Sequence, residues 1–398
     1  MELTTAGESH GPCVTAILSG VPAGLALLVE DVDRDLARRQ IGYGRGGRMA
    51  IEKDRARLTS GIRHSYTLGS PICIVIENRD WANWREEMSP GPPANGWRSA
   101  REVHVPRPGH ADLAGAAKYG RADMRNVLER ASARETAARV AAGAVCRRLL
   151  EEVGVTVRSR TVSIGGVRDE SSDLSAEDWQ AVEASDLRCA DEDAAGRMRD
   201  LIDRARAGGD SLGGEVEIVA DGVPPGLGSY ITWDSRLEAR IGQGMLGIPA
   251  IKAMAVGAGF DAGAITGSQY HDPILRRDAP WPFARPSNHA GGIEGGMTNG
   301  EPVVVRILMK PIPTLTSPLP SVDVRSGEPA DAHAERSDVC AVPAAGVVAE
   351  AMLALVLASA TCEKFGGDCM GDLLAAKEHY LARLSLPWDE GRALADEA

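Results

Sequence analysis

The stretch AAGVVAEAMLALVLASATCEK, residues 344–364, is apolar on nearly every side of a helix. Such a helix needs neighbours all round, so the pattern predicts a buried core helix. Gly366 and Gly367 follow it and predict its end, because glycine readily adopts the backbone conformation that stops a helix. The uncharged run inside it, residues 351–362, is well short of the roughly 20 residues that cross a bilayer. The stretch therefore indicates the centre of a soluble protein, with no membrane partner.

Helical and strand-like patterns alternate irregularly before this core helix. Residues 31–40 are amphipathic, residues 133–153 are alanine-rich, and residues 191–207 are polar enough for a surface helix. Strand-like runs occupy residues 13–18, 72–76, 155–164, 214–220 and 302–309. Several of them alternate apolar and polar residues, which is typical of sheets with one solvated face. Because strands and helices do not alternate as βαβ units, we predict an α+β fold rather than a doubly wound sheet.

Composition, net charge and the lack of linker segments limit the class of protein. No proline- or serine-rich linker divides the chain, so we expect a single domain over residues 1–398. The formal net charge of −12 argues against a protein that coats nucleic acid or an anionic membrane. Seven scattered cysteines without a CxxC pair predict free thiols, a cytoplasmic location and no metal site. The first residues lack a basic segment followed by an apolar one, so we expect no signal peptide.

Residues 36–51 contain no acidic side chain but include four arginines. In an acidic protein such an island indicates a binding site for a small anion, with a solvated basic face as the alternative. Its segment GYGRGG, residues 42–47, satisfies the GxGxxG pattern. The dinucleotide fingerprint requires a strand before this pattern and a helix after it. Here a helical pattern precedes and strand-like residues follow, so we expect a cationic loop instead.

Two histidines lie in turns that suit proton transfer. The segment GESHG, residues 7–11, places His10 between small residues, and PRPGHAD, residues 106–112, holds His110 in a frame stiffened by two prolines. An imidazole with an ordinary pKa of about 6.5 exchanges protons near neutral pH. Taken alone, either histidine also fits a structural role in its turn.

The segment ERASARET, residues 129–136, combines a helix start with arginines. Ser132 and Glu135 fit a capping box, so we predict that the helix begins at Ser132, with Arg134 in its first turn. Arginine is unfavourable at this end because the helix dipole already makes it positive. A bound anion would explain the arginines. Compensation by neighbouring glutamates is the alternative.

Together and in this order, the motifs resemble those of the chorismate synthases. The matching segments are residues 7–11, 38–48, 106–112, 129–136, 288–300 (NHAGGIEGGMTNG), 310–314 (KPIPT) and 336–345 (RSDVCAVPAA). The likeness covers about residues 3–368, leaves a tail of residues 369–398, and is greatest to actinobacterial-type members. It implies one α+β domain with helices sandwiched between antiparallel sheets, assembled as a homotetramer.

The resemblance also implies a reaction. Chorismate synthases are lyases of the shikimate pathway, which leads to the aromatic amino acids. They use reduced FMN to eliminate phosphate from 5-enolpyruvylshikimate 3-phosphate in an anti-1,4 sense, giving chorismate, and NADPH can serve as reductant. The substrate carries two carboxylates and a phosphate, which agrees with an arginine-rich pocket in an acidic protein.

Residue roles follow from the same resemblance. His10 is expected beside the leaving phosphate, His110 is expected to protonate the reduced flavin, and Asp338 is expected to form a proton relay with Ser9 and Ser132. The expected substrate contacts are Arg39, Arg45, Arg48, Arg134 and Arg336, of which Arg39 and Arg45 also match positions sometimes assigned to NADPH. The expected flavin contacts are Arg130, Ala131, Ser132, Pro249, Ala250, Gly295, Lys310, Pro311, Ile312, Pro313, Thr314 and Arg336.

Two positions depart from the family pattern. Gln40 stands where many relatives carry a third arginine, and Pro249 stands where Asn or Gln is usual beside the flavin. Because proline has no backbone N–H, we expect an altered flavin affinity. Three other functions stay open: a paralogue acting on a related cyclohexene phosphate, a plain NADPH:FMN reductase, and a nucleic-acid-binding module. The last lacks interleaved aromatic residues, since only Tyr43 lies in the arginine–glycine loop.

Overall fold

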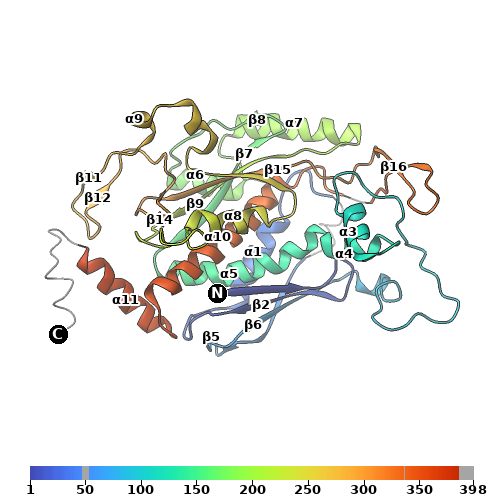
Figure 1. Cartoon of the computed structure of the whole chain (residues 1–398), viewed down its shortest axis with the longest axis horizontal. Coiled ribbons are helices and arrows are strands. Elements are labelled where there is room, and N and C mark those ends of the chain that lie inside the picture. The colour runs from blue at the N-terminus through green and yellow to red at the C-terminus, as the bar shows by residue number, and fades with distance from the viewer. Residues whose placement is uncertain (47–52, 336, 385–398) are drawn as a thin grey trace.

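Two antiparallel sheets enclose a layer of helices (Figure 1). The computed structural model describes residues 1–46, 53–335 and 337–384. The first sheet has the order β1 (Glu2–Ala6), β2 (Cys13–Ser19), β6 (Ile72–Glu77), β3 (Ala56–Ser60). The second has the order β10 (Ile251–Val256), β15 (Val303–Met309), β9 (Gly214–Asp221), β7 (Thr156–Ile164), β8 (Val167–Arg168). The helices between them are α1 (Val29–Gln40), α5 (Thr136–Glu152) and α10 (Val342–Phe365). The predicted α+β class and sandwich are therefore confirmed.

The predicted core helix is α10, and it is buried over most of its length. It packs on α5 on one side and on β7 and β9 on the other. By length and composition it is the one helix among the described residues apolar enough to cross a membrane, but 83% of its most apolar window is buried inside the protein. A helix covered in this way is a core helix. It links the two halves of the sandwich because both of its faces are apolar.

Gly143 of α5 marks the closest approach of α5 to α10. A Cβ atom built on Gly143 lies 2.3 Å from the Cβ of Ala351. Gly143→Ala should therefore lower the free energy of unfolding by roughly 1–3 kcal/mol, because the two helices must move apart. Urea unfolding measures this. The control is Gly196→Ala in α7 (Glu192–Gly208), where nothing lies within 4 Å and stability should hold or rise by up to about 1 kcal/mol. Equal stability of the two variants would contradict the close approach.

All four predicted helices and all five predicted strands are present within a few residues of their expected ends. The short helices were not predicted, because their patterns are too brief to show a clear period. These are α3 (Asp112–Tyr119), α4 (Arg125–Ala131), α6 (Ala176–Ala184), α8 (Leu237–Leu246) and α9 (Gly267–Tyr270). The segment expected to be a tail contains α11 (Met370–Arg383), whose Met370 and Leu373 join the main core.

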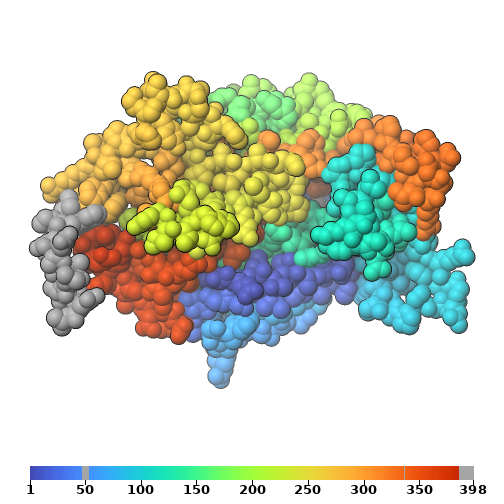
Figure 2. All heavy atoms as spheres, viewed as in Figure 1, coloured from blue at the N-terminus to red at the C-terminus, as the bar shows by residue number. Residues whose placement is uncertain are grey.

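Minor elements complete the described chain. The 3-10 turns are η1 (Trp81–Asn83), η2 (Ala133–Glu135) and η3 (Gly259–Ala264). The two- and three-residue strands are β4 (Ile62–Arg63), β5 (Tyr66–Thr67), β11 (Leu275–Arg276), β12 (Phe283–Ala284), β13 (Ile293–Glu294), β14 (Met297–Thr298), β16 (Pro320–Val322) and β17 (Pro329–Asp331). The long connection between β6 and α3 projects at one end of the molecule (Figure 2). This end also carries α3, α4 and β16 (Figure 1).

The start of α5 differs from the prediction. Ser132 does cap a turn, since its Oγ accepts a hydrogen bond from the N–H of Arg134 at 3.3 Å. However, that turn is η2, and α5 begins only at Thr136. Glu135 does not complete the predicted capping box. Its carboxylate instead accepts hydrogen bonds from Arg139, one helical turn later, and from Thr5. The charged partner at i+4 outcompetes the backbone N–H.

Candidate active site

One cavity of about 390 Å³ gathers most of the residues that the motifs single out. This volume is within the range of small-molecule sites. One part of the wall is apolar and comes from β15, the connection before β10, and the start of α10. Its apolar side chains are Ile248, Ala250, Met309, Ile312, Ala341, Ala344, Ala345 and Val348. The ionisable side chains on the wall are His10, Arg39, Arg45, Arg107, His110, Lys310, Glu335 and Asp338.

His110 is held by a buried carboxylate. Its Nδ1 lies 2.5 Å from Oδ1 of Asp112, which is fully buried at the start of α3. Arg107 donates from Nε to Oδ2 of Asp112 at 2.8 Å and from Nη1 to Oγ1 of Thr314 at 3.0 Å. Burial raises the pKa of Asp112, but the hydrogen bonds from His110 and Arg107 outweigh it and hold that pKa well below its usual range. Nη2 of Arg107 also lies 3.1 Å from Nδ1 of His110. Because both contacts are made at Nδ1, Nε2 is the ring atom that can exchange a proton with a ligand.

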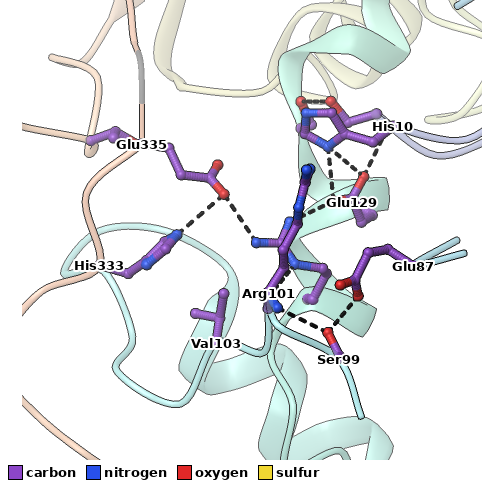
Figure 3. Close-up of polar contacts among 12 residues, drawn as sticks. His10, Glu87, Ser99, Arg101, Val103, Glu129, His333 and Glu335 are labelled. Carbon is purple, nitrogen blue, oxygen red and sulfur yellow. Dashed lines mark hydrogen bonds and ion pairs between the residues drawn. The ribbon is translucent and has the colours of Figure 1, made fainter. Parts of the chain in front are cut away.

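His10 is also held by a carboxylate, that of Glu129 on α4 (Figure 3). Its Nδ1 lies 2.9 Å from Oε1 of Glu129, and its backbone N–H donates to Oε2 at 2.8 Å. Arg125 donates to the same carboxylate at 2.9 Å. Burial raises the pKa of Glu129, but the hydrogen bonds from His10 and Arg125 bring it below its usual value. The imidazole also stacks on Trp84, with ring centroids 3.8 Å apart, so its orientation is fixed by both the carboxylate and the indole.

The three residues expected to form a relay all line the cavity. Ser132 Oγ donates to Ser9 Oγ at 3.1 Å, so these two hydroxyls are in direct contact. Asp338 accepts a hydrogen bond from the N–H of Gly46 at 2.6 Å and lies 3.4 Å from Nη1 of Arg45. The carboxylate therefore also anchors the described part of the arginine–glycine loop. The rest of that loop, including Arg48, lies outside the described residues, as does Arg336.

The expected anion contacts divide into two groups. Arg39 and Arg45 line the cavity, whereas Arg134 does not. Arg134 is buried and binds Asp54 through Nη1 at 2.6 and 2.7 Å. Arg39 donates from Nε to the Thr136 hydroxyl at the start of α5 and from Nη2 to the Ala133 carbonyl in η2, so two hydrogen bonds orient its guanidinium.

The expected flavin contacts divide in the same way. Ala131, Ser132, Pro249, Ala250, Lys310, Ile312, Pro313 and Thr314 line the cavity. Arg130, Gly295 and Pro311 are not part of its wall. Arg130 instead donates to the carbonyls of Thr5 and Gly7. Lys310 donates from Nζ to the Gly109 carbonyl at 2.6 Å, and burial lowers the pKa of its ammonium group.

Sequence reasoning did not find Glu335, Arg125 or Trp84. Glu335 lines the cavity and contacts Arg125, and Trp84 lies between His10 and the guanidinium of Arg101, which sits 3.9 Å from its ring centroid. Each is a single residue in a polar segment without periodicity. Only the fold brings them together, because Arg125 and Glu335 are 210 positions apart. A cluster built by such distant contacts leaves no local signal in the sequence.

Comparisons with known proteins identify the family of this chain. A family model described as chorismate synthase matches residues 1–362. The chain is 56% identical over 381 residues to the chorismate synthase of Desulforudis audaxviator, covering 96% of this chain and 97% of the relative. It is 53% identical over 384 residues to that of Rubrobacter xylanophilus, with the same two shares. A crystal structure of chorismate synthase matches with a TM-score of 0.77 at 42% identity, covering 96% of this chain and 98% of the other. This chain belongs to the chorismate synthase family.

Proposed function

We propose that the cavity between α4, α5 and α10 eliminates phosphate from 5-enolpyruvylshikimate 3-phosphate with reduced FMN, giving chorismate. The family consists of lyases of the shikimate pathway that depend on a reduced flavin, and neither a flavin reductase nor a nucleic-acid-binding protein is among the relatives named above. One observation carries the assignment to this cavity. Two imidazoles, His10 and His110, line it together, and each is held through Nδ1 by a buried carboxylate. Such an arrangement fixes the tautomer of a general acid or base.

The wall of the cavity fits a flavin. Its apolar side from Ile248 to Ala250 and along the start of α10 suits a flat ring system, and the cations Lys310 and Arg107 suit its phosphate and carbonyl oxygens. Pro249 lines the cavity and offers neither a polar side chain nor an N–H there. Reduced FMN supplies the electron density that a redox-neutral elimination of an allylic phosphate requires. The protein supplies binding, orientation and protons.

The charges of the cavity fit the substrate. Arg39 and Arg45, from the end of α1 and the loop after it, and Arg107, from the segment before α3, all reach the wall, so cations come to the cavity from two distant parts of the chain. A substrate with two carboxylates and a phosphate needs several cations, and guanidinium groups bind such oxygens in pairs. We assign Arg39 and Arg45, together with Arg48 and Arg336, to these groups. Arg134 binds Asp54 instead, so we assign it no direct contact with the substrate.

We assign proton transfer to the two histidines and to the relay of Ser9, Ser132 and Asp338. His10 donates a proton to the leaving phosphate, which would otherwise depart as a more basic anion. His110 would give a proton to the reduced flavin from Nε2, which requires the imidazolium form if Nδ1–H is donated to Asp112. Ser9, Ser132 and Asp338 would form a proton relay towards the flavin, with the Ser132–Ser9 hydrogen bond as one step.

Anaerobic incubation with photoreduced FMN and the enolpyruvyl ester tests the function. We expect chorismate, followed by absorbance, and one phosphate released for each chorismate formed. Flavin oxidation without either product would reject the proposal in favour of a reductase. Replacing photoreduction by NADPH in a parallel reaction decides whether the protein reduces its own flavin, as we infer from the positions of Arg39 and Arg45.

We also propose a single domain, a homotetramer and a cytoplasmic location, as the resemblance implies.

Asp338→Asn should lower turnover by about 10²-fold while the substrate KM changes only a few-fold. The amide keeps an oxygen for the Gly46 N–H, so the loop stays anchored, but it cannot pass a proton on. Anaerobic steady-state kinetics measure both constants. Asp331→Asn, an exposed aspartate on β17, is the matched control and should behave as wild type. If Asp338→Asn raises KM without lowering kcat, Asp338 acts in binding and not in the relay.

A further inference from the structure

Glu335 lies on the cavity wall where the two histidine arrangements meet. Its Oε1 accepts a hydrogen bond from Nη2 of Arg125 at 3.3 Å, and its Oε2 lies 4.0 Å from Nη1 of Arg107. Its third partner is His333, whose Nε2 is 3.2 Å from Oε1 (Figure 3). A single carboxylate therefore contacts three cationic or protonatable groups from three different segments.

The two arginines that meet at Glu335 each support one cavity histidine. Arg125 also binds Glu129, which holds His10, as Figure 3 shows for the labelled pair. Arg107 also binds Asp112, which holds His110. Glu335 thus joins the two histidine–carboxylate–guanidinium units by contacting the arginine of each.

We propose that Glu335 is a positioning residue for the elimination, which couples the two units so that the cavity retains one proton on an imidazole. This inference rests on the proposed function of the cavity. It adds to that function a residue outside the recognised motifs, since neither segment 310–314 nor segment 336–345 contains it.

The charges of the described cluster explain the coupling. It contains three carboxylates, of Asp112, Glu129 and Glu335, and two guanidiniums, of Arg107 and Arg125. One protonated imidazole, of His10 or His110, makes this cluster neutral, whereas without Glu335 the cluster is already balanced and the extra proton is disfavoured. His333 also contacts Glu335, but it is not part of the cavity wall, so a proton on it does not reach a ligand in the cavity.

Glu335 is ionised at neutral pH. The hydrogen bond from His333 lowers its pKa, burial raises it, and Arg107 and Arg125 lower it further, to about 2. The other cation nearby, Arg101, faces Trp84 through its guanidinium and Arg125 through its backbone carbonyl, so it does not neutralise Glu335. The third negative charge of the cluster therefore persists throughout the pH range in which an imidazole titrates.

Glu335→Gln separates the charge of this residue from its shape. We expect kcat to fall at least about tenfold at neutral pH, a part of the roughly 10²–10⁴ that a general acid contributes. We also expect the alkaline limb of the kcat–pH profile to move to lower pH, because the proton is lost more easily. Glu335→Asp keeps the charge and should return the limb towards the wild-type position. Glu328→Gln, an exposed glutamate of the same segment, is the control and should change neither.

Flavin binding and the pH profile together distinguish a lost charge from a distorted cavity. Titration of the flavin-free variants with FMN should give a Kd within a few-fold of wild type, which excludes a collapsed cavity. A wild-type profile for Glu335→Gln, or a lower kcat with the alkaline limb unmoved, overturns the coupling. If the wild-type protein forms no chorismate, the proposed function of the cavity is rejected. If the wild type is active and Glu335→Gln has the same kcat and pH profile, only the role of Glu335 is rejected.

Discussion

His110→Ala should lower anaerobic turnover by about 10²–10⁴-fold, while FMN binds within a few-fold of its wild-type affinity. The imidazole reaches the cavity wall with its Nδ1 fixed by a buried carboxylate, Asp112. Alanine removes the imidazole with the proton that it can supply from Nε2, but leaves Arg107 paired with Asp112, so the buried carboxylate keeps a cationic partner. The loss should therefore appear in kcat and not in binding. Single-turnover absorbance measurements and flavin titration give the two quantities separately.

The control for this variant is a histidine without access to the cavity. His379 is exposed on α11, and His379→Ala should have wild-type kinetics. If His110→Ala also turns over at the wild-type rate, His110 has no part in proton transfer. If it loses flavin affinity by the same factor as kcat, its role is to shape the cavity rather than to exchange a proton.

The fold was predictable because its decisive elements are long and strongly patterned. The core helix α10 is apolar all round, and strands such as β9 and β15 alternate buried residues with more exposed ones along their whole length. Period and burial follow directly from such patterns. Short helices such as α3 and α4 carry too few residues to show a period, and the contacts they make with distant loops fix them instead.

Charged residues were harder to place than apolar ones. Arg38 and Arg39 are adjacent in a stretch without acids, and both fit an anion site on that evidence. In the fold they point in different directions, since Arg39 lines the cavity and Arg38 binds Glu350 and Glu183. Helix geometry separates neighbouring side chains by about 100°, so one arginine faces the ligand and the next faces the core. Arg38 needs a partner 312 positions away, which no local pattern reveals.

That partner, Glu350, sits at the centre of a buried ion-pair network. It lies on α10 with no exposed surface and accepts hydrogen bonds from Arg38, Arg147 and Arg188, and from the Ser159 hydroxyl. Asp35 and Glu183 complete the network by binding the same arginines. Three carboxylates thus balance three guanidiniums where α1, α5, α10 and β7 meet. The network holds α1, whose last turn carries Arg39 into the cavity.

Glu350→Ala should lower the free energy of unfolding by about 3–5 kcal/mol, because it leaves buried guanidiniums without their shared partner. Urea unfolding at neutral pH measures the loss. Glu183→Ala is the matched control, since Glu183 binds Arg38 and Arg188 but is half exposed to solvent. An exposed partner is screened by water, so this variant should lose at most about 1 kcal/mol. Equal losses in the two variants would show that burial does not set the strength of the network.

The effect of Glu350→Ala should also depend on pH in a defined direction. Burial raises the pKa of Glu350, but Arg38, Arg188 and Arg147 outweigh it and hold that pKa at about 2. A carboxyl whose pKa is lower in the folded than in the unfolded chain stabilises the fold above its unfolded pKa of about 4.3. That stabilisation is lost as the pH falls from there towards 2. The stability difference between wild type and Glu350→Ala should therefore be constant from neutral pH down to about pH 5 and shrink below it. A difference that stays the same at pH 3 would mean that the side chain acts by filling space and not by its charge.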